Sequence, residues 1–400
     1  MKRRKFDIVP LGELLEGTPR NGYSPVCPEL PTGKWVLGLS ALDGRGLDLS
    51  EPKPAPANNP LVDKFMLRPG DFLISRSNTF DKVGRVGVFR GELENCSYPD
   101  LMMRFRPDCE KVNPPYLETY LQSDAAIKFI RQHATGTSGS MKKINQSTVE
   151  SIPVVVPPIL EQASIAALLL EWYDAIQKTE QLIAAKERHY SHELSRLFSE
   201  YRTTPRRCRL GDISYVPQKL PEAPQANDVY VLVRLYCKGI EKNERQKQAP
   251  TKNGRPIFRR NAGELLVGRQ NIHNGGFGIV PKDLNGSLAS SAITSLSFHP
   301  EKASAEYVFF YLSRPSHYKK IERVMGGTGQ KEISESQLMA LPIPMPALHT
   351  QTAIARYLNA LREEIDLLGQ SVAALKSQKR GLMQKLLTGQ WRLPVQEEAN

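Results

Sequence analysis

The chain has 400 residues, of which 40% are hydrophobic, and a formal net charge of +12. It is long enough for two or three domains, and a polyanion is the first partner to consider. The sequence contains no run of 18 apolar residues, its N-terminus shows no signal-peptide pattern, and its five cysteines and seven histidines follow no metal-ligand or disulfide spacing. These observations exclude membrane, secreted and zinc-cluster classes, and we expect a cytoplasmic protein with no metal site.

The first half contains a predicted strand that ends in an arginine. The turn Pro69-Gly70 leads into a short strand, residues 71–75, with the apolar run 72–74 at its centre, and Arg76 and Asn78 follow. Arginine and asparagine suit bidentate contacts with guanine and adenine edges, so both are predicted DNA contacts. Lys82 and Arg85 are weaker candidates nearby. The alternative is that Arg76 satisfies a carboxylate or carbonyl at the strand end.

The stretch Asn113-Pro114-Pro115-Tyr116 matches the NPPY signature of adenine-N6 methyltransferases. A second interpretation is a helix start, with Asn113 as the cap, Pro114 at the first helical position and Tyr116 in the core. The equivalent stretch of the second half, residues 304–307, lacks the prolines. A methyltransferase also needs a cofactor site, and the nearest candidate, residues 83–87, is weak. We therefore favour the helix start.

Two glycine-rich basic loops are predicted to contact phosphate. Residues 136–143 end in Lys142 and Lys143, and residues 326–331 end in Gln330 and Lys331. Small residues let backbone amides approach a phosphate, and lysine adds salt-dependent attraction. A flexible solvated loop is the alternative, because glycine and serine also favour turns.

Two long helices are predicted, each directly after a proline-rich stop at residues 152–158 or 341–346. Apolar residues recur in both at alternating spacings of four and three, the pattern of a coiled-coil seam. A rod of 33 residues is roughly 50 Å long and would span on the order of 15 base pairs. The predicted inter-helix seam is Ile165, Leu169, Trp172, Ile176, Ile183, Ile354, Leu358, Leu361, Ile365, Leu368, Val372, Leu375, Leu382 and Leu386.

The chain is an internal repeat of two halves. Residues 262–269 match residues 69–76, residues 307–312 match 116–121, and residues 333–346 match 144–157. By this alignment Arg269, Gln270 and Asn271 are the second-half candidates for base contact. The loop 252–260 adds Arg255, Arg259 and Arg260 as predicted DNA-backbone contacts, with a solvated charge run as the alternative.

Taken together, the proline-flanked helices and the repeat resemble the specificity subunit of type I restriction-modification enzymes. Residues 378–389 and the lead-in 341–351 look like that family's C-terminal conserved region, and residues 157–162 look like its central conserved region. The tip of the first helix, residues 187–191, departs from the pattern.

The resemblance implies an α+β fold with two pseudo-repeated mixed α/β target recognition domains, separated by a long antiparallel two-helix coiled coil. The expected segments are residues 1–158 (domain 1), 159–202 (central conserved helix), 203–346 (domain 2), 347–391 (C-terminal conserved helix) and 392–400 (tail). Their net charges are +3, −2 and +9 for the first three and +2 for the last two together.

By the same resemblance, the two domains read the halves of a bipartite double-stranded DNA target. The helices set the spacing and hold two modification (methyltransferase) subunits, and restriction/translocase subunits complete the complex. This chain is expected to have no catalytic residues and no cofactor of its own, because S-adenosylmethionine, ATP and Mg²⁺ belong to the partner subunits. The alternatives are a methyltransferase that acts through residues 113–116, and a coiled-coil adaptor that does not bind nucleic acid.

Overall fold

A computed structural model describes residues 6–44, 46–136, 141–199, 207–225, 227–244, 255–325 and 331–394. The chain forms two compact units. Unit 1 comprises Met1–Thr179 and Ser371–Asn400, and unit 2 comprises Glu180–Gln370. The divisions fall within the two long helices, so each unit holds one globular domain and one part of each helix. The units are described separately.

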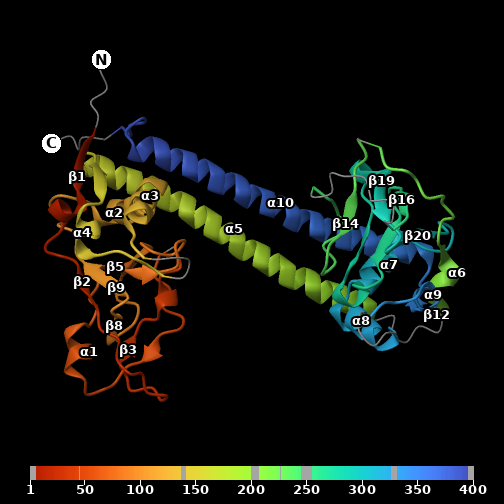
Figure 1. The fold of residues 1–400 in the computed structure, drawn as a ribbon, viewed down its shortest axis with the longest axis horizontal. Coiled ribbons are helices and arrows are strands. Elements are labelled where there is room, and N and C mark those ends of the chain that lie inside the picture. Colours follow the sequence, from red (N-terminus) through yellow and green to blue (C-terminus); the bar gives the residue numbers. More distant parts are fainter. Residues whose placement is uncertain are drawn as a thin grey trace. The chain divides into compact units, whose positions relative to one another are not determined.

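Unit 1 is built around a four-stranded antiparallel sheet of order β2-β9-β5-β7, with smaller sheets β1-β11, β6-β10 and β4-β3-β8. Its helices α2, α3 and α4 lie near the start of the long helix α5 (Ile159–Ser199), and α1, β3 and β8 lie on the far side of the sheet from it (Figure 1). Its elements are β1 Asp7–Pro10, β2 Arg20–Asn21, β3 Trp35–Val36, β4 Lys53–Pro54, α1 Pro60–Lys64, β5 Asp71–Ser75, β6 Ser77–Asn78, β7 Val86–Phe89, β8 Cys96–Ser97, β9 Met102–Phe105, α2 Pro114–Leu121, α3 Asp124–His133, β10 Lys142–Lys143, α4 Gln146–Glu150 and β11 Pro153–Val156.

Unit 2 repeats this plan, with a four-stranded sheet of order β13-β20-β17-β18 and the two-stranded sheets β12-β21, β14-β15 and β16-β19. Its elements are β12 Arg207–Arg209, α6 Leu210–Ile213, β13 Ser214–Tyr215, β14 Val231–Val233, β15 Ile240–Lys242, β16 Ile257–Arg260, β17 Leu265–Gly268, β18 Phe277–Ile279, β19 Ser287–Ser290, β20 Ile293–Phe298, α7 Ala305–Leu312, α8 Pro315–Ile321, α9 Glu335–Met339 and β21 Pro342–Pro344.

The repeat extends to the order and pairing of the strands. The strands β5 and β17 occupy the same third place in their sheets, and each is antiparallel to both neighbours. In each unit the first strand pairs antiparallel with the last, as β1 with β11 and β12 with β21. The internal similarity seen in the sequence is therefore a similarity of fold.

The two long helices are α5, Ile159–Ser199, and α10, Leu348–Leu387. They begin at or within one residue of the predicted starts at 159 and 347. In unit 1 the start of α5 packs against the end of α10, since Ile165 and Leu386, both 0% exposed, share one core. In unit 2 the start of α10 packs against the end of α5, where Leu358 and Phe198 share the core. The pairing is antiparallel in both units, as expected of the fold class.

Every residue of the predicted inter-helix seam is buried or half-buried. Polar residues also lie along the inter-helix seam. Lys186 forms an ion pair with Glu364 in unit 2, with Nζ 2.7 Å from Oε1, and Lys379 lies over the ring of Tyr173 in unit 1. Burial lowers the pKa of Lys379. The spacing of four and three thus marks the inward faces of both helices.

The NPPY stretch begins a helix. The side chain of Asn113 accepts a hydrogen bond from Tyr116 N at 3.0 Å, and Tyr116 is fully buried with its hydroxyl donating to Val155 O at 2.7 Å. In unit 2, Ser304 caps α7 in the same way and the hydroxyl of Tyr307 donates to Pro344 O. A capping side chain and a core tyrosine serve the fold, so these residues form no base-binding site in this conformation.

Candidate nucleic-acid interface

The structure brings the predicted contacts of domain 1 together on one edge. Strand β6 pairs with β10, so Lys142 lies opposite Asn78 and Lys143 lies opposite Ser77. The backbone N–H of Ile144 donates to Arg76 O at 2.9 Å, which fixes the lysine loop beside the strand end. Residues from sequence segments more than 60 positions apart therefore form one site, which includes Arg76, Asn78, Lys82, Arg85, Lys142 and Lys143 and is called the domain 1 cluster.

A turn after β6 adds Lys82 and Arg85 to the domain 1 cluster. Lys82 N donates to Thr79 O at 3.0 Å, and Arg85 O accepts from Ser75 N at 2.9 Å. Lys82 and Lys143 are exposed, and neither has a carboxylate partner among the described residues. Exposed, unneutralised ammonium groups can release counterions from a polyanion, so this cluster suits phosphate contact.

Two arginines of the domain 1 cluster have intramolecular partners. Arg76 Nη1 donates to Asp100 O at 3.3 Å, and Arg85 Nη1 donates to Leu42 O at 3.4 Å. Asn78 is 7% exposed and its Oδ1 accepts from Thr79 N. These contacts match the alternative interpretation of a strand-end arginine. Base contact by the three side chains, which would need them to change partners, remains a prediction.

The equivalent edge of domain 2 has the same backbone geometry. Ile333 N donates to Arg269 O at 3.2 Å, as Ile144 N does to Arg76 O. The charges differ, because Arg269 Nη2 lies 2.8 Å from Glu332 Oε1 and Lys331 Nζ lies 2.7 Å from Glu322 Oε1. Gln330, another predicted contact, lies outside the described residues.

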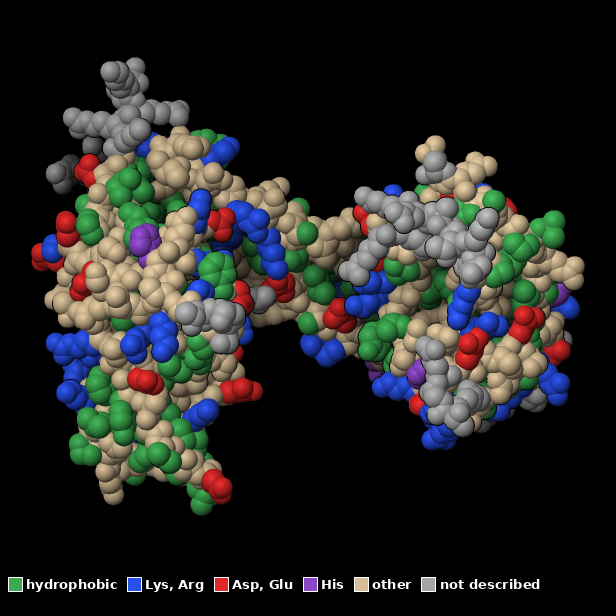
Figure 2. Space-filling view, viewed as in Figure 1, with side chains coloured by type: hydrophobic (Ala, Val, Ile, Leu, Met, Phe, Trp, Pro, Cys, Tyr) green, Lys and Arg blue, Asp and Glu red, His purple; other side chains and the backbone are tan. Residues whose placement is uncertain are grey.

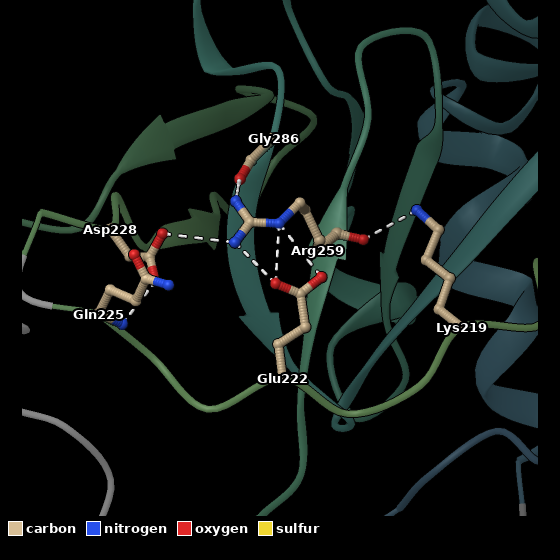
Figure 3. Close-up of polar contacts among 6 residues, drawn as sticks. All are labelled: Lys219, Glu222, Gln225, Asp228, Arg259 and Gly286. Atoms are coloured by element: carbon tan, nitrogen blue, oxygen red, sulfur yellow. Dashed lines mark hydrogen bonds and ion pairs between the residues drawn. The ribbon is translucent and has the colours of Figure 1, made fainter.

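One arginine of the predicted basic loop of domain 2, Arg259, is neutralised by carboxylates. Arg259 donates to both oxygens of Glu222, with Nε 3.1 Å from Oε1 and Nη2 2.7 Å from Oε2. It also donates to Gly286 O at 2.6 Å and to Asp228 Oδ1 at 3.5 Å (Figure 3). These carboxylates raise the pKa of Arg259. They come from a segment about 35 residues earlier in the chain, which a local charge count cannot reveal.

Arg260 and Arg255 have opposite environments. Arg260 is 5% exposed, and its Nη2 donates to Ile293 O at 2.8 Å and Ser290 O at 3.3 Å. Burial lowers its pKa. Its guanidinium cannot reach a phosphate without leaving these carbonyls. Arg255 is exposed at the start of the described part of the loop, and residues 252–254 lie outside it.

A pocket of about 360 Å³ opens beside two predicted base-contact residues of domain 2, Gln270 and Asn271. The residues that line it carry no charge, and they include Tyr230, Asn243 and Ser290. Tyr230 is 7% exposed, and its hydroxyl has no hydrogen-bond partner among the described residues. Sequence reasoning missed Tyr230, because nothing local distinguishes it from a core tyrosine.

On the face shown in Figure 2, Lys and Arg lie in several separate groups, mixed with acidic and neutral side chains. No three His, Cys, Asp or Glu side chains within the described ranges are grouped to hold a metal ion. A search of the same residues for a helix long and apolar enough to cross a membrane found none.

Comparison with known proteins agrees with this architecture. The family model "Type I restriction modification DNA specificity domain" matches residues 240–377. The putative type I restriction enzyme MjaX specificity subunit of Methanocaldococcus jannaschii is 24% identical over 351 residues, which cover 83% of this chain and 81% of that protein. The EcoKI specificity subunit of Escherichia coli is 28% identical over 164 residues, 40% of this chain and 35% of that protein.

Two solved structures share the fold over nearly the whole chain. The type I restriction-modification S subunit from M. genitalium aligns with a TM-score of 0.59 and 13% identity, covering 97% of both chains. A chain from a structure that describes complex assembly and conformational transition of the type I R-M system aligns with a TM-score of 0.57 and 15% identity, covering 97% of this chain and 98% of that one.

The repeated domains and the two antiparallel helices define a class of two-domain protein in which each unit holds one globular domain and one part of each helix. The family model and the relatives indicate a specificity subunit of a type I restriction-modification system, and the solved structures share the fold. Specificity subunits are non-catalytic components of these complexes, and the methyltransferase interpretation of residues 113–116 is not favoured.

Proposed function

We propose that this chain reads a bipartite double-stranded DNA sequence in the cytoplasm, one half-site with each domain. The helices α5 and α10 hold two modification subunits and set the spacing between the half-sites. S-adenosylmethionine, ATP and Mg²⁺ act in the modification and restriction subunits, and this chain contributes recognition.

The observation that carries this proposal is the repeated edge. In both domains the loop before the last small helix is hydrogen-bonded to the carbonyl of a strand-end arginine, Arg76 or Arg269. Two copies of one surface suit a target of two separate halves. The relatives named as specificity subunits add support, since a specificity subunit selects the site at which a restriction-modification complex acts.

The two domains are expected to bind in different ways. Domain 1 presents exposed lysines for phosphate contact, which gives affinity and register. Domain 2 presents amides beside an uncharged pocket, and asparagine and glutamine suit the N6 and N7 edge of adenine. We therefore expect Gln270 and Asn271 to affect base preference more than salt dependence.

The test is to map N6-methyladenine across the genome of cells that express this chain with its modification subunit. The expected result is a split motif that disappears when this chain is deleted and returns when it is restored. The variant Gln270→Ala should relax the half read by domain 2 and leave the other half unchanged. The proposal is wrong if active complexes methylate no split motif, or if methylation does not depend on this chain.

A further inference from the structure

Phe80 is an exposed aromatic side chain beside the domain 1 cluster. Its exposed fraction is 53%, although the residues before and after its turn, Asn78 and Val83, are buried. Single exposed apolar residues are common on protein surfaces and mean little by themselves. The turn that holds Phe80 and the charges around it distinguish this one.

The turn is fixed by hydrogen bonds on both sides of Phe80. Asn78 Oδ1 accepts from Thr79 N at 2.9 Å, and Thr79 Oγ1 donates to Asp81 Oδ1 at 2.6 Å. The backbone N–H groups of Lys82 and Val83 both donate to Thr79 O. A side chain presented by so constrained a turn loses little conformational freedom when it binds.

Helix α3 supports the turn from behind. Gly84 has a φ of +79°, and a Cβ there would lie 2.4 Å from Ile130 of α3. From the same helix, Arg131 Nη2 donates to Asp81 O at 2.8 Å, and its guanidinium lies 5.5 Å from the centroid of the Phe80 ring. The turn is thus seated directly on the helix.

Cationic residues lie in and beside the turn that holds Phe80. The guanidinium of Arg131 lies over the ring, and Lys82 is exposed two residues after Phe80. Lys142 lies opposite Asn78 in the strand pair, and its Nζ donates to Gly136 O at 2.8 Å. In domain 2 the position equivalent to Phe80 is His273, which is only half-buried and carries no apolar ring. A different aromatic side chain is exposed beside that position, since Tyr236 is 68% exposed and its backbone N–H donates to Asn274 O at 2.8 Å.

We propose that Phe80 is a wedge that inserts against a base step of the half-site read by domain 1, partly unstacking it, while the neighbouring cations hold the flanking phosphates. Apolar side chains that enter a base stack kink the duplex, most easily at pyrimidine–purine steps. Phe80 would then impose a preference for a flexible step without hydrogen-bonding any base. This inference rests on the proposed DNA-reading function.

The experiment uses the full chain with its modification subunit and a duplex that carries the mapped methylation motif. 2-Aminopurine is placed in turn at each position of the domain 1 half-site, and its fluorescence rises when its neighbour unstacks. Binding by the unaltered complex should raise fluorescence several-fold at one step, and Phe80→Ala should abolish that rise. Phe80→Ala should also weaken target binding roughly tenfold, as loss of one stacked contact does.

Two controls separate this wedge from other roles. Phe80→Trp keeps a large ring and should keep the fluorescence rise, and Tyr215→Ala removes an exposed aromatic in domain 2 and should change neither signal. If Phe80 only supports Arg131, Phe80→Ala will lower thermal stability and leave the fluorescence rise intact, which overturns the inference. Failure of the proposed function would give another result, because the unaltered complex would then bind the motif and an unrelated duplex with the same affinity.

Discussion

Two glutamines, one at the start of each long helix, should stabilise the junction between helix and domain. Gln162 is 1% exposed, its Oε1 accepts from Asn113 N at 2.8 Å and its Nε2 donates to Pro157 O at 2.8 Å. Gln351, also 1% exposed, accepts from Ser304 N at 3.0 Å and donates to Pro346 O at 2.9 Å. Each side-chain amide thus links the N-cap residue of a short helix, α2 or α7, to the proline-rich segment directly before a long helix, α5 or α10.

Replacing Gln162 with alanine leaves one backbone donor and one backbone acceptor without a partner. Each unsatisfied buried group costs about 1–3 kcal/mol, so for the two groups the free energy of unfolding should fall by about 2–6 kcal/mol. Gln351→Ala should cost at least as much, because its Nε2 also donates to Lys302 O at 3.2 Å. Gln177→Ala is the matched control, since Gln177 lies exposed on α5.

The sequence makes the two effects separable. The three tryptophans, Trp35, Trp172 and Trp391, all belong to unit 1. In urea unfolding, Gln162→Ala should therefore lower the midpoint followed by tryptophan fluorescence. Gln351→Ala should lower the midpoint followed by far-ultraviolet circular dichroism, which reports both units, and leave the midpoint followed by tryptophan fluorescence nearly unchanged. If both variants unfold within about 0.5 kcal/mol of Gln177→Ala, the surface-substitution range, the glutamines are not structural ties.

Three further outcomes test the site and its surroundings. Lys143→Ala should lower DNA affinity and reduce the slope of log affinity against log salt by about 0.9, as filter binding across a salt series can show. Arg259→Ala should instead lower thermal stability and leave this slope unchanged. Equal slopes for the two variants would contradict the conclusion that Lys143 contacts phosphate and Arg259 does not. Burial, with help from the charge of Arg314, lowers the pKa of His317 to about 4 from an ordinary 6.5. Between these two values the unfolded chain binds a proton that the folded chain does not, so the free energy of unfolding should fall by up to about 1.4 kcal/mol per pH unit as pH drops from 6.5 toward 4. Melting curves at a series of pH values should show a weaker dependence for His317→Leu. Asn113→Ala should cost about 1 kcal/mol through loss of a helix cap and leave methylation by the complex intact, while a complete loss of methylation by a folded variant would restore the catalytic interpretation.

The sequence by itself determined the architecture, because an internal repeat and the spacing of apolar residues can be recognised from the order of residues in the chain. The matched strand ends at Arg76 and Arg269 predicted two copies of one fold, and the spacing from Ile354 to Leu386 predicted which helix face is buried. Asn113 could be recognised as a cap because capping depends on the residue and its next three neighbours.

Only the tertiary structure decided which charged side chains are available to a partner. The charge of +9 on domain 2 suggested a strongly basic surface, yet Glu222 neutralises Arg259 and backbone carbonyls hold Arg260. Domain 1, with a net charge of only +3, keeps Lys82 and Lys143 exposed. Ion pairing depends on distances between residues far apart in the chain, and only the fold sets those distances.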